Sequence, residues 1–392
     1  CAKYANSPYA ITRFDDISGN IRFKRLKHNW YNGKCAFCGA SQSEYERGDD
    51  LESYAYEWIH TLTPEEIFGM KFDVIISNPP YQMNTGGAGK QAKPIYHRFV
   101  TQAKKMNPRY IVMITPSRWF AGGMGLEDYR SEMLNDNRIK YIVDYALSKD
   151  CFPGVDIAGG VNYFLWDRQY SGLCNYTFID SGSSIYLQRA LDEYNIFVRD
   201  NRAISIVRKV MSCKEKSVST LMSSLGPFGL GTAERGQKYK PIKGLTLLSS
   251  AGKSYISYSA IKTGFEYISK WKVIIGKATS AGAATANKDG LRKVIATLEI
   301  LEPGAVCTFS YFIGGAFDTK KEAENYVSYL ATKFTRFLLL QCLSSINITK
   351  ERFYFVPLQD FSKPWTDEEL YDKYGLTNEE MDFIESMIKP ME

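Results

Sequence analysis

The tetrapeptide Asn78-Pro79-Pro80-Tyr81 combines residue types that can activate an exocyclic amine on a ring. At average residue usage its chance occurrence in a chain of this length is on the order of one in a thousand. Such an amine is a poor nucleophile because its lone pair is delocalised into the ring. Two acceptors at its hydrogens, the Asn78 side-chain oxygen and the Pro79 carbonyl, pull the nitrogen toward tetrahedral geometry and free that lone pair.

The other residues of the tetrapeptide suit the same chemistry. The prolines lock the backbone so that the two acceptors converge. Tyr81 offers an aromatic face on which a flipped-out base can stack, a contact worth about 1–3 kcal/mol. Catalysis is then mainly positioning by preorganised dipoles, with no general base of shifted pKa. The alternative is a rigid turn at a strand end that carries no chemistry.

The elements around the tetrapeptide predict an open α/β sheet. The β-branched run 72–76 reads as a buried parallel strand that ends at Asn78. The segments that follow are a helix at 94–106, a strand at 110–114, a helix at 126–134, and strands at 139–145 and 161–166. In such sheets ligands bind beyond the carboxyl ends of the strands, where the tetrapeptide would lie.

The order of predicted strands and helices divides the chain into two domains. We expect residues 1–190 to form the α/β domain, with a hairpin insertion at 10–45. Residues 191–392 read as an α+β module with shorter strands and one long helix that begins after Thr319. The stretch from Phe361 onward carries nine acidic residues against three lysines, which predicts an acidic C-terminal helix.

Positive charge is concentrated in the second domain. The whole chain carries 49 Lys and Arg against 43 Asp and Glu, a net charge of +6. Residues 231–300 hold twelve Lys and Arg against four acids. This field, interleaved with aromatic residues, suits a phosphate backbone, although a solvated lysine-rich surface would look the same. The predicted DNA-binding residues are Lys238, Lys240, Lys243, Lys277, Arg292 and Lys293.

Eight scattered cysteines are typical of reduced thiols inside cells. Cys35 and Cys38 have the spacing of half a zinc knuckle, and Cys1 and His28 could complete a structural zinc site. The alternative is a pair of reduced thiols in a β-turn.

No apolar stretch approaches the roughly 20 residues that a membrane helix needs, and no segment resembles a secretion signal. We therefore expect a cytoplasmic protein without a membrane partner.

The sequence resembles a known enzyme family at several of these segments. The tetrapeptide and the run before it look like the catalytic motif of the S-adenosylmethionine-dependent amino-methyltransferases that act on adenine in DNA, in restriction-modification systems. The resemblance continues through the runs 110–119, 152–155 and 226–230. The order of the domains is similar to the subgroup in which a target recognition domain follows the methyltransferase domain.

The resemblance implies a fold, a cofactor, a partner and site residues. The fold is a Rossmann-like class I methyltransferase sheet, the cofactor is S-adenosyl-L-methionine and the partner is double-stranded DNA. Asn78 and Pro79 would polarise the adenine amine, and Tyr81 would stack on the base. An aromatic residue near Phe152 would pack on the opposite side of the base, with Phe164 and Trp166 as alternatives.

One feature of the family is missing ahead of Asn78. The family binds its cofactor with a glycine-rich FxGxG turn and a later acidic residue, and neither is found there. We expect the sheet to be N-terminally incomplete, with the first part of the cofactor domain upstream of Cys1. Counting back from Asn78, the family's adenine-binding turn falls near His60 and Thr61, which are the predicted cofactor contacts.

Three alternatives remain open from the sequence. The same tetrapeptide serves methylation of a cytosine amine, of guanine in RNA, or of a glutamine side chain in a protein, and the large basic module argues against the last. The chain could also be a non-catalytic DNA specificity fragment. No nuclease motif is evident, so a restriction endonuclease would lie upstream or in a partner subunit.

Overall fold

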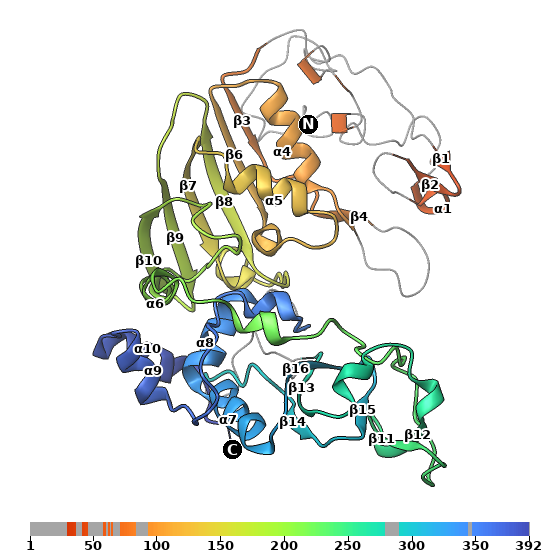
Figure 1. Ribbon diagram of the computed structural model, residues 1–392. Helices are drawn as coiled ribbons and strands as arrows, with labels where there is room; N and C mark the ends of the chain where they lie inside the picture. The colour runs from red at the N-terminus through yellow and green to blue at the C-terminus, as the bar shows by residue number, and fades with distance from the viewer. Residues whose placement is uncertain are drawn as a thin grey trace. The chain divides into compact units, whose positions relative to one another are not determined.

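The computed structural model describes residues 30–36, 41–45, 58–59, 62, 64–65, 71–83, 93–278, 290–343 and 347–391. The chain divides into two compact units, Cys1–Phe197 and Val198–Glu392, each of which contains strands and helices (Figure 1). Among the described residues, no helix is long and apolar enough to cross a membrane.

The first unit is built on a six-stranded sheet with the order β10-β9-β7-β8-β6-β3. The strands are β3 (Val74–Ser77), β6 (Tyr110–Pro116), β7 (Ile139–Tyr145), β8 (Val161–Asp167), β9 (Cys174–Asp180) and β10 (Ser183–Arg189). β3 is parallel to β6 and β7 is parallel to β9, whereas β8 is antiparallel to both of its neighbours. The carboxyl ends of β3, β6 and β7 therefore share one edge of the sheet.

Two helices cover one face of this sheet. They are α4 (Tyr96–Lys105) and α5 (Glu127–Leu134), and the short helix η2 (Ser117–Ala121) follows β6 (Figure 1). Alternate strand residues such as Met113 and Phe164 face these helices and are fully buried in one apolar core with Val100 and Met133. The strands and helices predicted at 94–166 are thus confirmed, with ends shifted by no more than two residues.

A small hairpin lies early in the chain. β1 (Trp30–Tyr31) pairs with β2 (Lys34–Cys35) across Asn32 and Gly33, both of which have positive φ. This is the conformation that a two-residue Asn-Gly turn requires. The short helix α1 (Gln42–Tyr45) follows. Residues 10–29 of the predicted hairpin insertion lie outside the described residues.

The second unit contains two three-stranded sheets. One has the order β12-β11-β15 and the other β14-β13-β16. Their strands are β11 (Gly244–Ser249), β12 (Gly252–Ser257), β13 (Trp271–Gly276), β14 (Leu298–Leu301), β15 (Ala305–Cys307) and β16 (Tyr311–Phe317). Side chains from both sheets, including Leu247, Val306 and Ile313, share one buried core.

Helices complete the second unit. They are α6 (Asn201–Ser212), α7 (Lys320–Ala331), α8 (Lys333–Cys342), α9 (Asp367–Lys373) and α10 (Asn378–Met387), with short turns η4 (Val218–Leu221), η5 (Tyr258–Ala260), η6 (Phe265–Tyr267) and η7 (Lys350–Phe353). The prediction of one long helix after Thr319 is wrong. The structure has two helices there, α7 and α8, which are separated at Thr332. The Thr332 side chain accepts a hydrogen bond from the Thr335 amide at 3.2 Å and so caps a new helix.

The acidic C-terminal stretch forms two helices instead of the one expected. Each begins with a capping box, Thr366 with Glu369 in α9 and Thr377 with Glu380 in α10. Gly375 lies between them with a φ of 60°, a left-handed conformation that ends α9.

Candidate active site

The tetrapeptide lies directly after β3, at the carboxyl edge of the first unit's sheet. β3 and β6 flank the crossover helix α4, and Ser77 is in register with Met113. Asn78 and Pro80 are exposed, whereas Pro79 is buried. The asparagine side chain is therefore accessible to a ligand on a backbone that two prolines hold in place.

Tyr81 is tied to the start of α4. Its carbonyl accepts a hydrogen bond from the Ile95 amide at 3.2 Å. The next residues form β4 (Gln82–Met83), which pairs with β5 (Lys93–Pro94) just before α4. The tetrapeptide is thus fixed at both ends, by β3 before it and by the β4 and β5 pair after it.

The Tyr81 side chain is half-buried, and its hydroxyl has no hydrogen-bond partner among the residues that the structure describes. Burial, and then the nearby Cys151 thiol, raise the pKa of Tyr81 to about 12. The phenol is neutral at physiological pH. A neutral ring without a hydrogen-bonding task suits stacking better than proton transfer.

The loop between β7 and β8 approaches Tyr81, since Cys151 lies close enough to affect its pKa. Ser148, a buried residue in the short helix η3 (Ser148–Asp150), holds this loop together. Its hydroxyl donates to the Val155 carbonyl at 2.8 Å and accepts from the Ile157 amide at 2.7 Å. Phe152, the predicted stacking residue, is half-buried within the turn that these bonds close.

A buried polar network supports the same edge of the sheet. The Asp144 carboxylate accepts from the Ser117 hydroxyl at 2.5 Å and from the Tyr176 hydroxyl at 2.7 Å. The Asn162 amide donates to the Ser117 oxygen at 3.2 Å, and the Ser117 amide donates to the Gly160 carbonyl at 3.0 Å. These bonds join the ends of β6, β7 and β8 to the β7–β8 loop.

Sequence reasoning missed Ser148 and this network. A detectable signal was present, because Asp144 interrupts the run of apolar and aromatic residues 141–145, and the structure buries it fully. Buried carboxylates usually accept hydrogen bonds, so an acidic residue in such a run predicts a nearby hydrogen-bond donor. The serines gave no comparable signal.

The alternatives to Phe152 have a different environment. Phe164 and Trp166 are buried in the core beneath α4 and α5, so they cannot reach a ligand without unfolding that core. Of the three aromatics, the structure leaves Phe152 as the accessible one.

Several predicted site residues cannot be placed. The cofactor contacts His60 and Thr61, and the zinc ligands Cys1, His28 and Cys38, lie outside the described residues. Cys35 is buried in a small apolar cluster with Ile59, Ile95 and Phe99. Within the described part of the chain, no three His, Cys, Asp or Glu side chains group as a metal site.

The predicted DNA-binding residues come from three places in the second unit. Lys238, Lys240 and Lys243 are exposed on the segment that leads into β11. Lys277 is half-buried after β13, with its ammonium 4.5 Å from the centre of the Phe309 ring. Arg292 and Lys293 follow residue 290, where the Arg292 backbone pairs with Met387 and Lys389.

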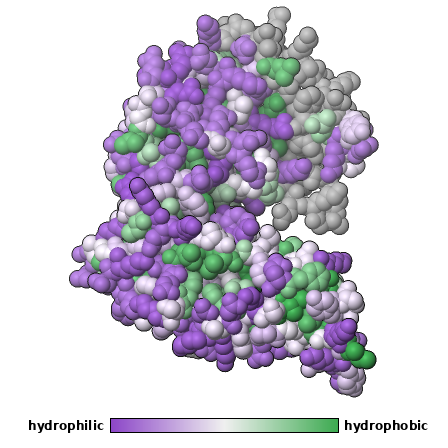
Figure 2. Space-filling model, in the orientation of Figure 1, coloured by the Kyte–Doolittle hydropathy of each residue, from purple (hydrophilic) through white to green (hydrophobic). Residues whose placement is uncertain are grey.

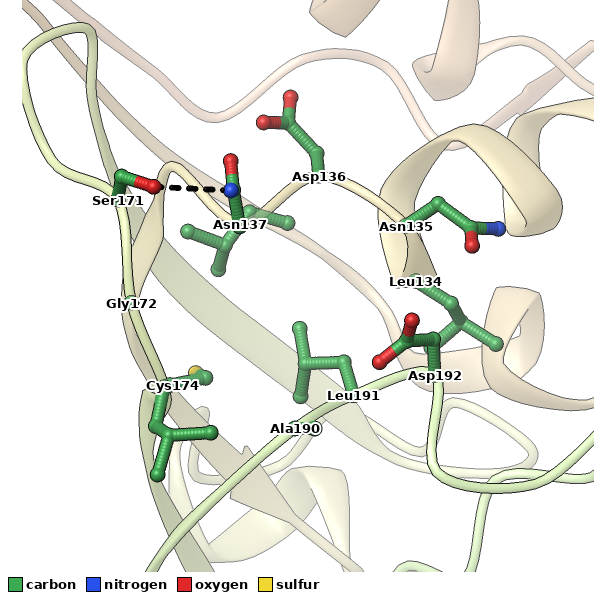
Figure 3. Close-up of a pocket in the computed structure, with 12 residues that line it drawn as sticks. Leu134, Asn135, Asp136, Asn137, Ser171, Gly172, Cys174, Ala190, Leu191 and Asp192 are labelled. Atoms are coloured by element: carbon green, nitrogen blue, oxygen red, sulfur yellow. Dashed lines mark hydrogen bonds between the residues drawn. The ribbon is translucent and has the colours of Figure 1, made fainter.

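A pocket of about 270 Å³ lies away from the tetrapeptide, at the opposite edge of the sheet where β7 begins (Figure 3). It is lined by Leu134, Asn135, Asp136, Asn137, Ile139, Ser171, Gly172, Leu173, Cys174, Ala190, Leu191 and Asp192.

One of the carboxylates that line this pocket, Asp136, already binds Arg138, Lys104 and the Trp166 ring N–H at 2.7, 2.9 and 2.9 Å. Burial alone would raise its pKa, but these partners lower it to about 2. The hydrogen-bonding capacity of this carboxylate is therefore used within the fold.

Comparison with known proteins agrees with the tetrapeptide and its setting. Residues 4–152 match the Eco57I restriction-modification methylase family. An uncharacterized adenine-specific methylase of Mycoplasma pneumoniae is 36% identical over 216 residues, which are 50% of this chain and 51% of that protein. The chain thus spans about half the length of this curated relative. The resemblance inferred from the sequence is confirmed.

Solved structures of restriction-modification enzymes show a distant likeness. The type IIL enzyme MmeI in complex with DNA has a TM-score of 0.37 and 8% identity, covering 86% of this chain and 56% of that one. The type IIG restriction endonuclease BpuSI has a TM-score of 0.32 and 9% identity, covering 78% of this chain and 49% of that one.

Proposed function

We propose that this chain methylates the exocyclic amine of adenine in DNA, as part of a restriction-modification system. The observation that carries the proposal is the position of Asn78 to Tyr81, which directly follow β3 at the carboxyl edge of the sheet with the Asn78 side chain exposed. This edge is where open α/β sheets bind their ligands. The match of residues 4–152 to a methylase family supports the same reading.

In the proposed reaction the Asn78 oxygen and the Pro79 carbonyl accept hydrogen bonds from the target amine and free its lone pair. Tyr81 stacks on the flipped base, and Phe152 closes the site from the β7–β8 loop. S-adenosylmethionine would supply the methyl group. Among the described residues, those of the proposed site bind the target base. The predicted cofactor contacts His60 and Thr61 lie outside the described residues.

The proposal extends to the finer fold and the division of labour. The first unit would be the Rossmann-like methyltransferase domain, and the second unit would be the target recognition domain. The parallel β3-α4-β6 crossover supports the first assignment. Five exposed lysines without an acidic neighbour at 237–262 support the second.

The test is Asn78→Ala, measured by transfer of a tritiated methyl group from S-adenosylmethionine to genomic DNA. We expect turnover to fall by roughly 100- to 1000-fold while DNA affinity stays the same, since Asn78 acts on the reacting amine. Asn137→Ala is the matched control, because Asn137 is an exposed asparagine at the opposite edge of the sheet. Undiminished transfer by Asn78→Ala would refute the mechanism.

Analysis of the digested product separates the remaining alternatives. N6-methyladenine supports the proposal, whereas N4-methylcytosine would assign the same chemistry to cytosine. DNA binding without any transfer would indicate a specificity fragment that lacks activity of its own.

A further inference from the structure

The second unit exposes large apolar side chains in one stretch of sequence. Among its described residues, the exposed ones are Tyr239, Ile242, Tyr258 and Phe265, at 77, 95, 45 and 45%. All four lie within or beside the hairpin of β11 and β12. Figure 2 shows hydrophobic surface beside strongly hydrophilic surface at this end of the unit. Ile242 contributes almost nothing to the core, and its place near other exposed apolar side chains suggests contact with a partner.

The same stretch is strongly basic. Residues 237–262 contain Lys238, Lys240, Lys243, Lys253 and Lys262 and no acidic residue. All five lysines are exposed. Ile242 is next to Lys243 and two positions from Lys240, so positive charge flanks the apolar side chain on both sides along the chain.

The segment that carries Ile242 is anchored at both ends to one strand. Before it, Gln237 and Tyr255 of β12 exchange two backbone hydrogen bonds of 2.8 and 3.0 Å. After it, Gly244 pairs with Ser257 of β12, and the Lys243 carbonyl accepts from the Tyr258 amide at 3.1 Å. The six residues 238–243 therefore form a short loop, which we call the 238–243 loop, that projects from a hydrogen-bonded base.

Ile242 occupies the corner of a tight turn in this loop. The Gly244 amide donates to the Pro241 carbonyl at 2.8 Å, and Lys243 adopts a φ of 54°. A lysine in the left-handed region is uncommon, and such backbone conformations concentrate at functional sites. The turn holds Ile242 outward in a fixed position, so little ordering is needed when it binds.

We propose that the 238–243 loop inserts Ile242 between adjacent base pairs of double-stranded DNA, while Lys238, Lys240 and Lys243 bind the flanking phosphates. Proteins that distort DNA use apolar wedges of this kind beside basic side chains, and the separated base step bends or unwinds the duplex. This inference rests on the proposed function, and it adds a way in which the second unit deforms its DNA.

The charge around the wedge favours DNA over a protein partner. Lysine is depleted at the centres of protein interfaces, where apolar side chains meet. Here lysines lie on both sides of the most exposed apolar residue, as expected for a partner with a phosphate on each side of an apolar base stack.

The test compares Ile242→Ser with the unaltered chain in two assays. Binding to a short duplex is measured by fluorescence anisotropy over a series of salt concentrations. Unwinding is measured by relaxing a closed circular plasmid with topoisomerase I in the presence of the protein. We expect Ile242→Ser to raise the Kd by about tenfold, from the loss of one buried aliphatic side chain, and to abolish unwinding. The salt slope should stay the same.

Lys240→Ala is the matched control on the same loop. It should reduce the slope of log K against log salt by about 1 and leave unwinding intact at saturating protein. Neither side chain is buried, so both variants should retain the far-ultraviolet circular dichroism and thermal unfolding of the parent.

The outcomes separate the wedge from the proposed function. DNA binding with unwinding that Ile242→Ser leaves unchanged, or with no unwinding at all, would overturn the wedge and leave the function standing. An unaltered chain that fails to bind DNA would contradict both. A loss of binding to phosphatidylserine vesicles by Ile242→Ser, with DNA binding unaffected, would also overturn the inference and indicate a membrane surface.

Discussion

Tyr81 shows how one side chain can be suited to stacking and unsuited to acid-base work. Its hydroxyl is buried without a partner, and the pKa of Tyr81 is raised to about 12. A buried unpaired hydroxyl destabilises the fold, so stability does not explain a tyrosine instead of a phenylalanine at this position. The ring, not the hydroxyl, is the functional part in the proposed mechanism.

Replacement of Tyr81 separates these two parts. Tyr81→Phe should keep methyl transfer close to the parent level and raise the thermal midpoint slightly, because an unsatisfied polar atom is removed. Tyr81→Ala should lower kcat/KM by roughly 10- to 100-fold through the lost stacking. Steady-state methyl transfer and thermal unfolding measure both effects. A Tyr81→Phe variant as inactive as Tyr81→Ala would assign a chemical role to the hydroxyl.

At the scale of elements, the β7–β8 loop depends on one close backbone approach. Gly160 has a φ of 81°, and a Cβ there would lie 2.0 Å from the Tyr145 carbonyl oxygen. Gly159 has a similar φ of 89°, but among the described residues no atom lies within 4 Å of its would-be Cβ. Both glycines therefore need a left-handed backbone, but only at Gly160 would a side chain collide with a neighbouring atom.

This contrast gives a prediction with its control built in. Gly159→Ala should destabilise the protein by about 1 kcal/mol, from the left-handed backbone alone. Gly160→Ala should destabilise it by several kcal/mol more and should lower methyl transfer, because the loop that carries Phe152 must shift. Urea unfolding and methyl transfer measure the two effects. Equal destabilisation by both variants would show that the loop can move away from Tyr145 freely.

The elements also show what the sequence could and could not predict. Strands such as Ile139–Tyr145 were predictable because short segments rich in β-branched and aromatic residues leave few alternatives. The break at Thr332 was not, since the apolar period from Tyr326 to Leu338 continues through it and threonine fits both a helix and a cap. Helical periodicity reports the buried face and is insensitive to a cap within it.

The candidate site divides in the same way. Asn78 to Tyr81 could be identified from the sequence because the motif is contiguous and follows a strand. Ser148 and the network of Asp144, Ser117 and Asn162 could not, because their partners lie between 7 and 45 residues away. Contacts at such separations are set by the sheet order, which local patterns do not encode.

At the scale of the whole molecule, each unit contains a basic group whose charged form is disfavoured by burial. In the first unit, burial and then the charge of Arg98 lower the pKa of His97 to about 4. In the second unit, burial lowers the pKa of Lys272 to about 8, although its ammonium donates to three backbone carbonyls at 2.7 to 3.3 Å. Both groups bind a proton more weakly in the folded chain than in the unfolded chain.

The sign of the pH dependence follows from these shifts. Where the unfolded chain binds more protons, stability rises with pH. The His97 contribution should therefore be lost as the pH falls from about 6.5 to 4, and the Lys272 contribution should grow as the pH rises from about 8 to 10. Urea-unfolding midpoints across this range, for the parent and two variants, measure both windows.

His97→Phe should reduce the loss of unfolding free energy between about pH 6.5 and 4, by an amount of order 2 kcal/mol at pH 4. The pH dependence between about 8 and 10 should stay the same. Lys272→Met should remove the Lys272 contribution between about pH 8 and 10 and leave the acidic window unchanged, even though the carbonyls left unpaired lower stability throughout. Because the two residues lie in different units, the double variant should show the sum of the two changes. A double variant that departs from this sum by more than about 0.5 kcal/mol would show that the two sites are energetically coupled.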